Sequence, residues 1–440
     1  MNPRFAPPVR REPPSSPARA DRPRDRVGTV GDLHASATRL TGLTDFGDDE
    51  YLDGLAVLLA SYATDEKLTP LGQKMSRVFL RDAMAARLLS EAAWQKYPEY
   101  VKVSITRPIF ITGLPRTGTT ALHRLLTADP GHQGLELWLT HMPQPRPPRD
   151  TWDADPYFAA MAAAFRQHHV EHPEFMGLHR LGADQVEECW RLLCQSMRSI
   201  SFECLAHLPT YSSWLRTRGW TDAYLRHRRN LQLIGLNDPH RRWVLKNPSH
   251  LFAIEDLLAV YPDALVIQTH RPPRVAIASA CSLSAHATAG WSERFLGPVI
   301  GADQLELWAR GLEEFMEVRA RARQGQFFDV WYDDFVADPI GTVESAYGYF
   351  GLELSGAAAD SMRAVWSAGV EAAGGAASDS LPGPGSPPSV SSHRYSLDRF
   401  GLTAEQVDER FAGYRWSRAR SPQAVVKVDG TVRAARSSKC

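Results

Sequence analysis

Four short apolar runs, each followed by a helical pattern, organise the middle of the chain. The expected strands are residues 108–112, 242–245, 264–268 and 327–332. Helices are expected after the first three of them, over the ranges 119–128, 250–260 and 274–285. Short buried strands that alternate with helices indicate a parallel sheet covered by helices on both faces. The pattern therefore predicts an α/β fold.

Two further helical regions flank these strands. Between residues 45 and 100, apolar positions recur at helical spacing and lead into the first strand. Residues 155–235 form a predominantly helical insertion with many aromatic side chains. The aromatic side chains of that insertion have two interpretations, which stay open: they pack between helices, or they cover a substrate pocket together with Trp138.

The two ends and one internal stretch differ in composition from the rest of the chain. Residues 1–30 are rich in Pro and Arg, and residues 415–440 are polar and basic, so we expect both to be disordered tails. Residues 371–390 are rich in Gly, Pro, Ser and Ala and are expected to form a mobile loop. These boundaries predict a single domain over residues 31–414.

Composition narrows the class of protein. The 440 residues include 50 Lys plus Arg and 50 Asp plus Glu, and a zero net charge argues against a nucleic-acid partner. No apolar run approaches the roughly 18 residues of a membrane span, and the N-terminus has no apolar signal region. The five cysteines form no C-x-x-C pair, which favours free thiols in a reducing compartment. We therefore expect a cytoplasmic protein.

The sharpest motif is a glycine loop between the first strand and its helix. It reads Gly113-Leu114-Pro115-Arg116-Thr117-Gly118-Thr119-Thr120. A turn of this kind directs backbone N–H groups and a helix N-terminus at one point, which suits a phosphate. The spacing is that of the P-loop G-x-x-x-x-G-K-S/T, so the sheet is expected to be P-loop-like.

One departure from that motif argues against ATP chemistry. Thr119 occupies the position of the P-loop lysine, and no strand ends in an obvious carboxylate ligand for Mg²⁺. A nucleoside triphosphatase needs both groups. The loop therefore predicts a site that binds an anion but does not perform ordinary ATP chemistry. Arg116 is the cation within this loop.

A second candidate anion site follows the third predicted strand. Arg271 stands at the carboxyl end of that strand, and Ser279 lies eight residues later in the next helix. Ligands of open α/β sheets bind beyond the carboxyl ends of the strands. Two anion sites on neighbouring strands indicate a nucleotide with separated phosphates.

With these motifs the chain resembles sulfotransferases that use 3′-phosphoadenosine 5′-phosphosulfate (PAPS), in particular the bacterial branch whose loop reads P-R-S/T-G-T-T. The likeness extends from about Asp45 to Tyr414. It implies the PAPS sulfotransferase fold, PAPS as co-substrate, PAP as product and no required metal. The cofactor-binding residues that it implies are Pro115, Arg116, Thr117, Gly118, Thr119, Thr120, Arg271, Ser279, Tyr332 near the adenine, and Arg394.

The second phosphate motif departs from the family at one position. The family usually reads R-D-x-R there, whereas this chain has Pro272 after Arg271. Because proline lacks an N–H and fixes φ, the turn that presents Arg271 is expected to differ in detail.

The resemblance also implies catalytic roles. Arg116 and Lys246 are the expected cations on the leaving phosphate, since preorganised charge acts where charge develops in the transition state. For the general base the first candidate is Glu136, beside an apolar Trp. His250 is its rival and His179 a further candidate, and the choice stays open.

The leading interpretation is therefore an enzyme that transfers the sulfuryl group of PAPS to a hydroxyl or amine of a small, apolar acceptor. Two alternatives remain at this point. One is a non-catalytic PAP-binding module, and the other is an atypical nucleotide kinase.

Overall fold

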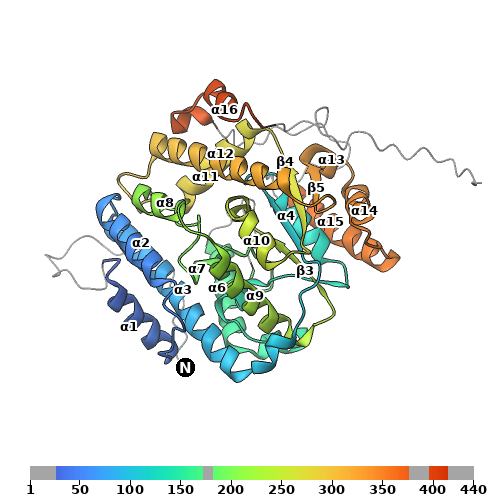
Figure 1. Cartoon of the computed structure of the whole chain (residues 1–440), viewed down its shortest axis with the longest axis horizontal. Coiled ribbons are helices and arrows are strands. Elements are labelled where there is room, and N and C mark those ends of the chain that lie inside the picture. The colour runs from blue at the N-terminus through green and yellow to red at the C-terminus, as the bar shows by residue number, and fades with distance from the viewer. Residues whose placement is uncertain (1–25, 172–181, 376–395, 415–440) are drawn as a thin grey trace, which may run out of the picture.

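A five-stranded parallel sheet lies at the centre of the protein, as the computed structural model shows for residues 26–171, 182–375 and 396–414 (Figure 1). The strands run in the order β2-β3-β1-β4-β5. Their bounds are β1 Ile109–Gly113, β2 His132–Gln133, β3 Arg242–Lys246, β4 Leu265–His270 and β5 Phe327–Trp331. The predicted α/β fold is confirmed, and only the two-residue β2 was not anticipated.

Successive side chains of the central strand enter different cores, as a strand with two covered faces requires. Ile109 and Ile111 belong to one buried cluster, and Phe110 belongs to the other. The register aligns Ile109 with Val244 of β3 and Leu265 of β4, which share its cluster. The sheet is therefore buried on both faces.

The smaller core is covered by helices that lie next to the sheet in the chain. It packs against α4 (Thr119–Thr127), α13 (Tyr332–Ala337), α14 (Pro339–Phe350) and α15 (Gly356–Gly375). Figure 1 shows α13, α14 and α15 together at one side of the molecule. Residues 371–375, the start of the expected mobile loop, are the last residues of α15, and residues 376–390 lie outside the described part.

The larger core holds most of the helices. They are α1 Val30–Thr41, α2 Leu52–Thr64, α3 Pro70–Lys96, α5 Leu137–His141, η3 Arg149–Ala154, α6 Pro156–Glu171, α7 Trp190–Cys194, α8 Pro209–Leu215, α9 Thr221–Ile234, η6 Pro248–Phe252, α10 Ile254–Val260, α11 Pro273–Ala287, α12 Gly297–Arg321, η7 Leu397–Phe400 and α16 Ala404–Arg410. The short helix η2 Pro98–Lys102 places Tyr100 in a third, small cluster, and η5 Gly235–Asn237 follows α9. The predicted insertion contains α6 to α9, and its residues 172–181 lie outside the described part. Within the described ranges, no helix is long and apolar enough to cross a membrane.

Several aromatic side chains of the insertion are buried in the core. Phe202 and Tyr211 are fully buried, and Phe158 and Trp220 are 4% exposed. Trp138 is also fully buried and meets Trp152 edge to face with ring centroids 5.3 Å apart. For these side chains the helix-packing interpretation holds.

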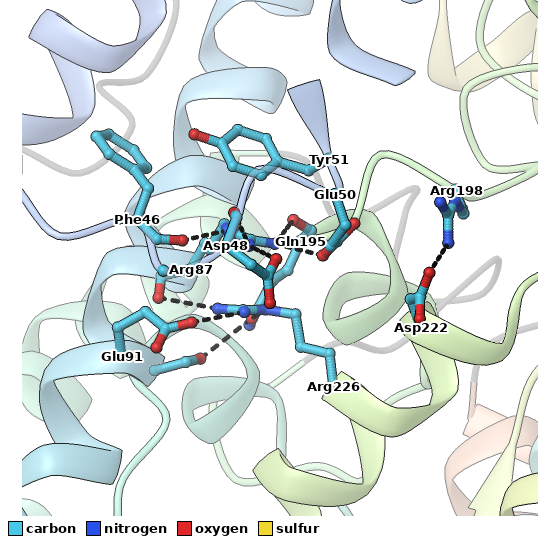
Figure 2. Close-up of polar contacts among 12 residues, drawn as sticks. Phe46, Asp48, Glu50, Tyr51, Arg87, Glu91, Gln195, Arg198, Asp222 and Arg226 are labelled. Carbon is cyan, nitrogen blue, oxygen red and sulfur yellow. Dashed lines mark hydrogen bonds and ion pairs between the residues drawn. The ribbon is translucent and has the colours of Figure 1, made fainter. Parts of the chain in front are cut away.

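Two buried arginines join the N-terminal helices to the insertion (Figure 2). Arg87 of α3 is fully buried and donates hydrogen bonds to Phe46 O, Asp48 Oδ1 and Glu50 Oε1 at 2.6–2.7 Å. Arg226 of α9 donates to Glu91 Oε1 at 2.7 Å.

Gln195, just after α7, connects the two arginines. Its backbone carbonyl accepts a bond from Arg87, and its side-chain oxygen accepts one from Arg226 Nε at 3.0 Å. Because each guanidinium is paired and multiply bonded, this network fixes the end of α7 against α3 and α9.

Residues 26–30, the end of the predicted N-terminal tail, lie within the described ranges, and Val27 is buried in the larger core. Val30 is the first residue of α1, and Thr29 and Asp32 form a capping box at its start. Residues 1–25 and 415–440, the expected tails, lie outside the described ranges.

Candidate active site

The glycine loop leaves β1 and enters α4 through two glycines that no other residue can replace without strain. Gly118 is the N-cap of α4 with φ 89°, and a Cβ there would lie 3.0 Å from the ring of Tyr332. Gly113 has φ 147°, and a Cβ there would lie 2.5 Å from Thr269 O. The loop is therefore closely packed against β4 and the start of α13.

Arg116, at the tip of this loop, adopts a left-handed backbone with φ 67°. That conformation is unfavourable for a residue with a Cβ and is common at functional sites. Two contacts hold it: Arg271 Nη1 donates to Arg116 O at 3.0 Å, and Arg116 Nε donates to Ser279 Oγ at 3.2 Å. The structure thus brings together the three residues that sequence analysis assigned to two anion sites.

The loop threonines have different surroundings. Thr117 is 1% exposed, and its hydroxyl donates to Leu114 O at 2.7 Å, so this group is used inside the loop. Thr119 is also buried, whereas the Thr120 hydroxyl accepts a hydrogen bond from Lys246 Nζ at 3.2 Å. Among the described contacts, only the Thr120 side chain connects the loop with Lys246.

Arg271 and Tyr332 lie against each other beyond the carboxyl ends of β4 and β5. The guanidinium carbon of Arg271 is 4.1 Å from the centre of the Tyr332 ring, a cation–π distance. Pro272, the departure noted in the sequence, has φ −51° and its carbonyl accepts from Val275 N at 3.0 Å. The proline thus ends β4 and begins α11 within its normal φ range.

Lys246, at the carboxyl end of β3, forms an ion pair that the sequence did not predict. Its Nζ contacts Glu188 Oε1 in a short hydrogen bond. The Lys246 side chain is 3% exposed and the Glu188 side chain 25%. The carboxylate closest to the predicted catalytic lysine is therefore Glu188.

Backbone hydrogen bonds on both sides hold Glu188 at this position. Glu187 N donates to Leu135 O at 2.7 Å, and Cys189 N donates to Lys246 O at 3.1 Å. The segment that ends at Glu188 thus lies between the stretch after β2 and the end of β3. Because these contacts join segments far apart in the chain, no local sequence pattern reveals them.

Burial raises the pKa of Glu188 above its ordinary value, although the ammonium of Lys246 opposes the shift. Glu187 adds to the rise by its negative charge. A carboxylate with a raised pKa is a better proton acceptor than an ordinary one, which suits a general base.

Glu136, the first candidate base, has a different partner. Its carboxylate accepts from Arg146 Nε at 3.1 Å, and Arg146 also contacts Asp238 Oδ2 at 3.0 Å. Burial raises the pKa of Glu136, and Arg146 opposes the rise. Among the described contacts, none joins Glu136 to Lys246 or to the glycine loop.

His250, the rival base, is fully buried between aromatic rings. Its Nδ1 lies 2.7 Å from Tyr224 Oη, and Phe110 meets its ring edge to face. Burial holds its pKa well below the usual value. The other candidates His179 and Arg394 lie outside the described residues.

The assembled site can neutralise a strongly anionic ligand. Arg116, Lys246 and Arg271 supply three cations around one loop, and Glu188 supplies a carboxylate next to one of them. Within the described ranges, no three His, Cys, Asp or Glu side chains gather into a metal-binding set. The arrangement suits transfer of a charged group from a nucleotide.

Comparison with known proteins identifies relatives over most of the chain. Residues 108–356 match the sequence profile of the Sulfotransferase family. The crystal structure of sulfotransferase STF1 from Mycobacterium tuberculosis H37Rv aligns with a TM-score of 0.80 at 54% identity, covering 88% of this chain and 100% of that one.

Two further relatives are more distant. Sulfotransferase STF9 from Mycobacterium avium aligns with a TM-score of 0.76 at 27% identity, covering 88% of this chain and 95% of that one. The omega-hydroxy-beta-dihydromenaquinone-9 sulfotransferase Stf3 of Mycobacterium bovis is 28% identical over 284 residues, which are 59% of this chain and 67% of that protein.

Proposed function

Because the chain belongs to the sulfotransferase family, we propose that it transfers the sulfuryl group of PAPS to a hydroxyl of a small acceptor. One observation carries the proposal. Lys246 Nζ lies in contact with both the Thr120 hydroxyl of the glycine loop and the Glu188 carboxylate. A cation and a base therefore stand next to the loop that would hold the sulfuryl donor.

The nucleotide site has the features that a donor with separated phosphates needs. The loop from Pro115 to Thr120 would hold the 5′-phosphosulfate, with Gly118 allowing close approach of the backbone. Arg271 and Ser279 would hold the 3′-phosphate. Tyr332, under the Arg271 guanidinium, would lie beside the adenine. Arg394 remains a proposed additional phosphate ligand.

Arg116 and Lys246 would stabilise the negative charge that develops on the leaving phosphate. Both are held in place before reaction, Arg116 by Ser279 and Arg271, and Lys246 by Thr120 and Glu188. Cations that are already oriented need little reorganisation when charge appears, which is the main source of their catalytic effect. PAPS itself supplies the activated sulfuryl group.

Glu188 would act as the general base that accepts the proton of the acceptor hydroxyl. Contact with Lys246 supports Glu188 over Glu136, since both side chains are partly exposed and burial raises the pKa of both. Partial exposure and a raised pKa support it over the fully buried His250. Glu136 faces Arg146, and His250 has no exposed surface with which to meet an acceptor. Glu136 remains the alternative base.

The acceptor is proposed to be a hydroxylated, lipid-like small molecule. The support is the name of one relative, which acts on a hydroxylated menaquinone derivative. The alternatives of a nucleotide kinase and of a PAP-binding module without activity both predict no transfer from PAPS.

The test is incubation of the full chain with radiolabelled PAPS and a panel of hydroxylated lipids and phenols, with a metal chelator present. Label should move to at least one acceptor, with release of PAP. Tight PAP binding without transfer to any acceptor would support the binding module. Phosphoryl transfer from ATP that requires Mg²⁺ would support the kinase.

A further inference from the structure

Arg191 is a partly buried arginine without a polar partner, three residues after Glu188. It donates no hydrogen bond and forms no ion pair with any residue in the described ranges, and its Nε is buried and unpaired. Its one close contact of note is with Trp190, whose ring centre lies 4.2 Å from the guanidinium carbon. A buried unpaired polar group is rare in native structures and calls for an explanation.

A mobile backbone does not explain why Arg191 has no partner. Arg191 belongs to α7, which is fixed at both ends. At the start of α7, Cys189 N donates to Lys246 O. At its end, Gln195 is bonded to Arg87 and Arg226 (Figure 2). The backbone of Arg191 is therefore held firmly while its guanidinium is left without a partner.

Arg87 and Arg226, both labelled in Figure 2, differ from Arg191 in having polar partners. Arg87 and Arg226 are more deeply buried, yet each donates several hydrogen bonds and pairs with a carboxylate. Arg87 and Arg226 thus each have a carboxylate partner, whereas Arg191 has none among the described residues. Burial lowers the pKa of Arg191, and its buried Nε makes no hydrogen bond in return.

Other polar side chains surround Arg191 and are also only partly buried. Asp82 of α3, His141 of α5 and Tyr157 of α6 come from three different elements, and burial shifts the pKa of each toward its neutral form. Glu187, also nearby, interacts electrostatically with both Arg191 and Glu188. This polar group therefore adjoins the proposed base.

The charges in this group nearly cancel. Asp82 is paired with Arg81, and Glu187 is the negative charge with the largest effect on Arg191. An incoming anion would be repelled by Asp82, Glu187 and Glu188. A neutral oxygen would instead accept a hydrogen bond from Arg191 and leave the charge balance unchanged.

We propose that Arg191 binds a neutral oxygen of the acceptor, a carbonyl or a second hydroxyl, remote from the hydroxyl that receives the sulfuryl group. This inference rests on the proposed function and adds a polar requirement to the acceptor. Arg191 is then a specificity-determining residue, because an acceptor that lacks the second oxygen leaves the guanidinium unsatisfied.

The first test is independent of the acceptor and measures the melting temperature of Arg191→Met. If the guanidinium waits for a ligand, its removal takes an unpaired charge out of a desolvated site, and the melting temperature stays the same or rises. A clear fall in the melting temperature would mean that Arg191 has a structural role, and it would overturn the inference.

The second test compares hydroxyketones with plain alcohols of the same chain length, across a series of lengths, as acceptors of label from PAPS. The wild type should prefer the hydroxyketones, and Arg191→Met should lower their kcat/KM by about 10- to 100-fold through KM, since a hydrogen bond to a charged group is lost. The plain alcohols should change little. Equal use of both series by the wild type, or an equal loss for both in the variant, would overturn the inference.

A matched control is Arg198→Met. Arg198 lies a few residues after α7, is 13% exposed and pairs with Asp222 at 3.1 Å, so its loss should leave acceptor preference unchanged (Figure 2). PAP affinity, measured by calorimetry, should be the same in the wild type and both variants. Failure of the wild type to bind PAP would contradict the proposed function itself, which separates that outcome from failure of the role of Arg191.

Discussion

Lys246 and Glu188 form an ion pair at the carboxyl end of β3, and the same lysine contacts the Thr120 hydroxyl of the glycine loop. The pair connects the end of a central strand with a segment that enters from the helical insertion. Lys246 therefore lies next to both the proposed sulfuryl donor site and the candidate base Glu188.

The pH dependence of the reaction should report Glu188. Its pKa is raised by burial, and a base must be ionised to accept a proton, so kcat/KM should rise as pH increases through that raised pKa. The acidic limb should therefore lie at higher pH than for an ordinary glutamate. A limb that persists unchanged in Glu188→Gln would assign the titration to another group.

Removal of either proposed cation should slow turnover. Lys246→Met and Arg116→Met should each lower kcat by about 10²–10³, the usual effect of losing one preorganised charge at the transition state. Steady-state rates with radiolabelled PAPS measure the effect. Arg363→Met is a suitable control, because Arg363 is exposed and pairs with Asp360 at the surface. A near-normal rate for either test variant would exclude that residue from the mechanism.

The network of Figure 2 should contribute strongly to stability. Arg87→Met leaves the carboxylates of Asp48 and Glu50 without their partner and should lower the free energy of unfolding by about 3–5 kcal/mol. Denaturant unfolding measures it. Asp222→Asn, which disrupts an ion pair whose carboxylate is 57% exposed, should cost less than about 1 kcal/mol. An equal loss of unfolding free energy in both variants would contradict the larger contribution to stability expected of Arg87.

A buried histidine next to the nucleotide site should make stability depend on pH. His270 Nε2 lies 2.7 Å from Asp329, which Arg319 also contacts, and its Nδ1 lies 2.5 Å from Tyr414 Oη. Because Asp329 only accepts, Nε2 carries the proton and Nδ1 accepts from the tyrosine. Trp331 stacks on the ring at 4.2 Å.

Burial lowers the pKa of His270 below 6.5, and the contacts with His270 and Arg319 lower the pKa of Asp329. The unfolded chain therefore binds more protons than the folded one as pH falls below about 6.5, so stability should decrease there. His270→Gln should reduce the loss of unfolding free energy between about pH 7 and pH 5 relative to the wild type. An unchanged slope would mean that His270 has the same pKa in the folded and the unfolded chain.

The sequence predicted those features that depend on local pattern. The apolar runs located β1, β3, β4 and β5, and the family and the α/β fold are confirmed. The motifs placed Arg116, Arg271 and Ser279 beyond the ends of neighbouring strands, and in the structure Arg116 contacts both of the others. These successes have a common cause, because loop and strand ends meet at one edge of a parallel sheet.

The sequence could not predict the partner of Lys246. Glu187 and Glu188 are adjacent acidic residues in a stretch without periodicity, and nothing local distinguishes them from surface glutamates. Glu188 is positioned by backbone hydrogen bonds to Leu135 and Lys246, each more than 50 residues away along the chain. For the same reason the sequence could not predict the unpaired Nε of Arg191, because its polar neighbours Asp82, His141 and Tyr157 come from three other helices.

The most direct test of the Lys246–Glu188 pair is the single-turnover rate of sulfuryl transfer in Glu188→Gln, measured beside Glu136→Gln with saturating PAPS. The pair predicts a rate lowered by about 10²–10⁴ in Glu188→Gln, a rate close to wild type in Glu136→Gln, and unchanged PAP affinity in both. A normal rate in Glu188→Gln with a strongly reduced rate in Glu136→Gln would contradict it and return the role of base to Glu136.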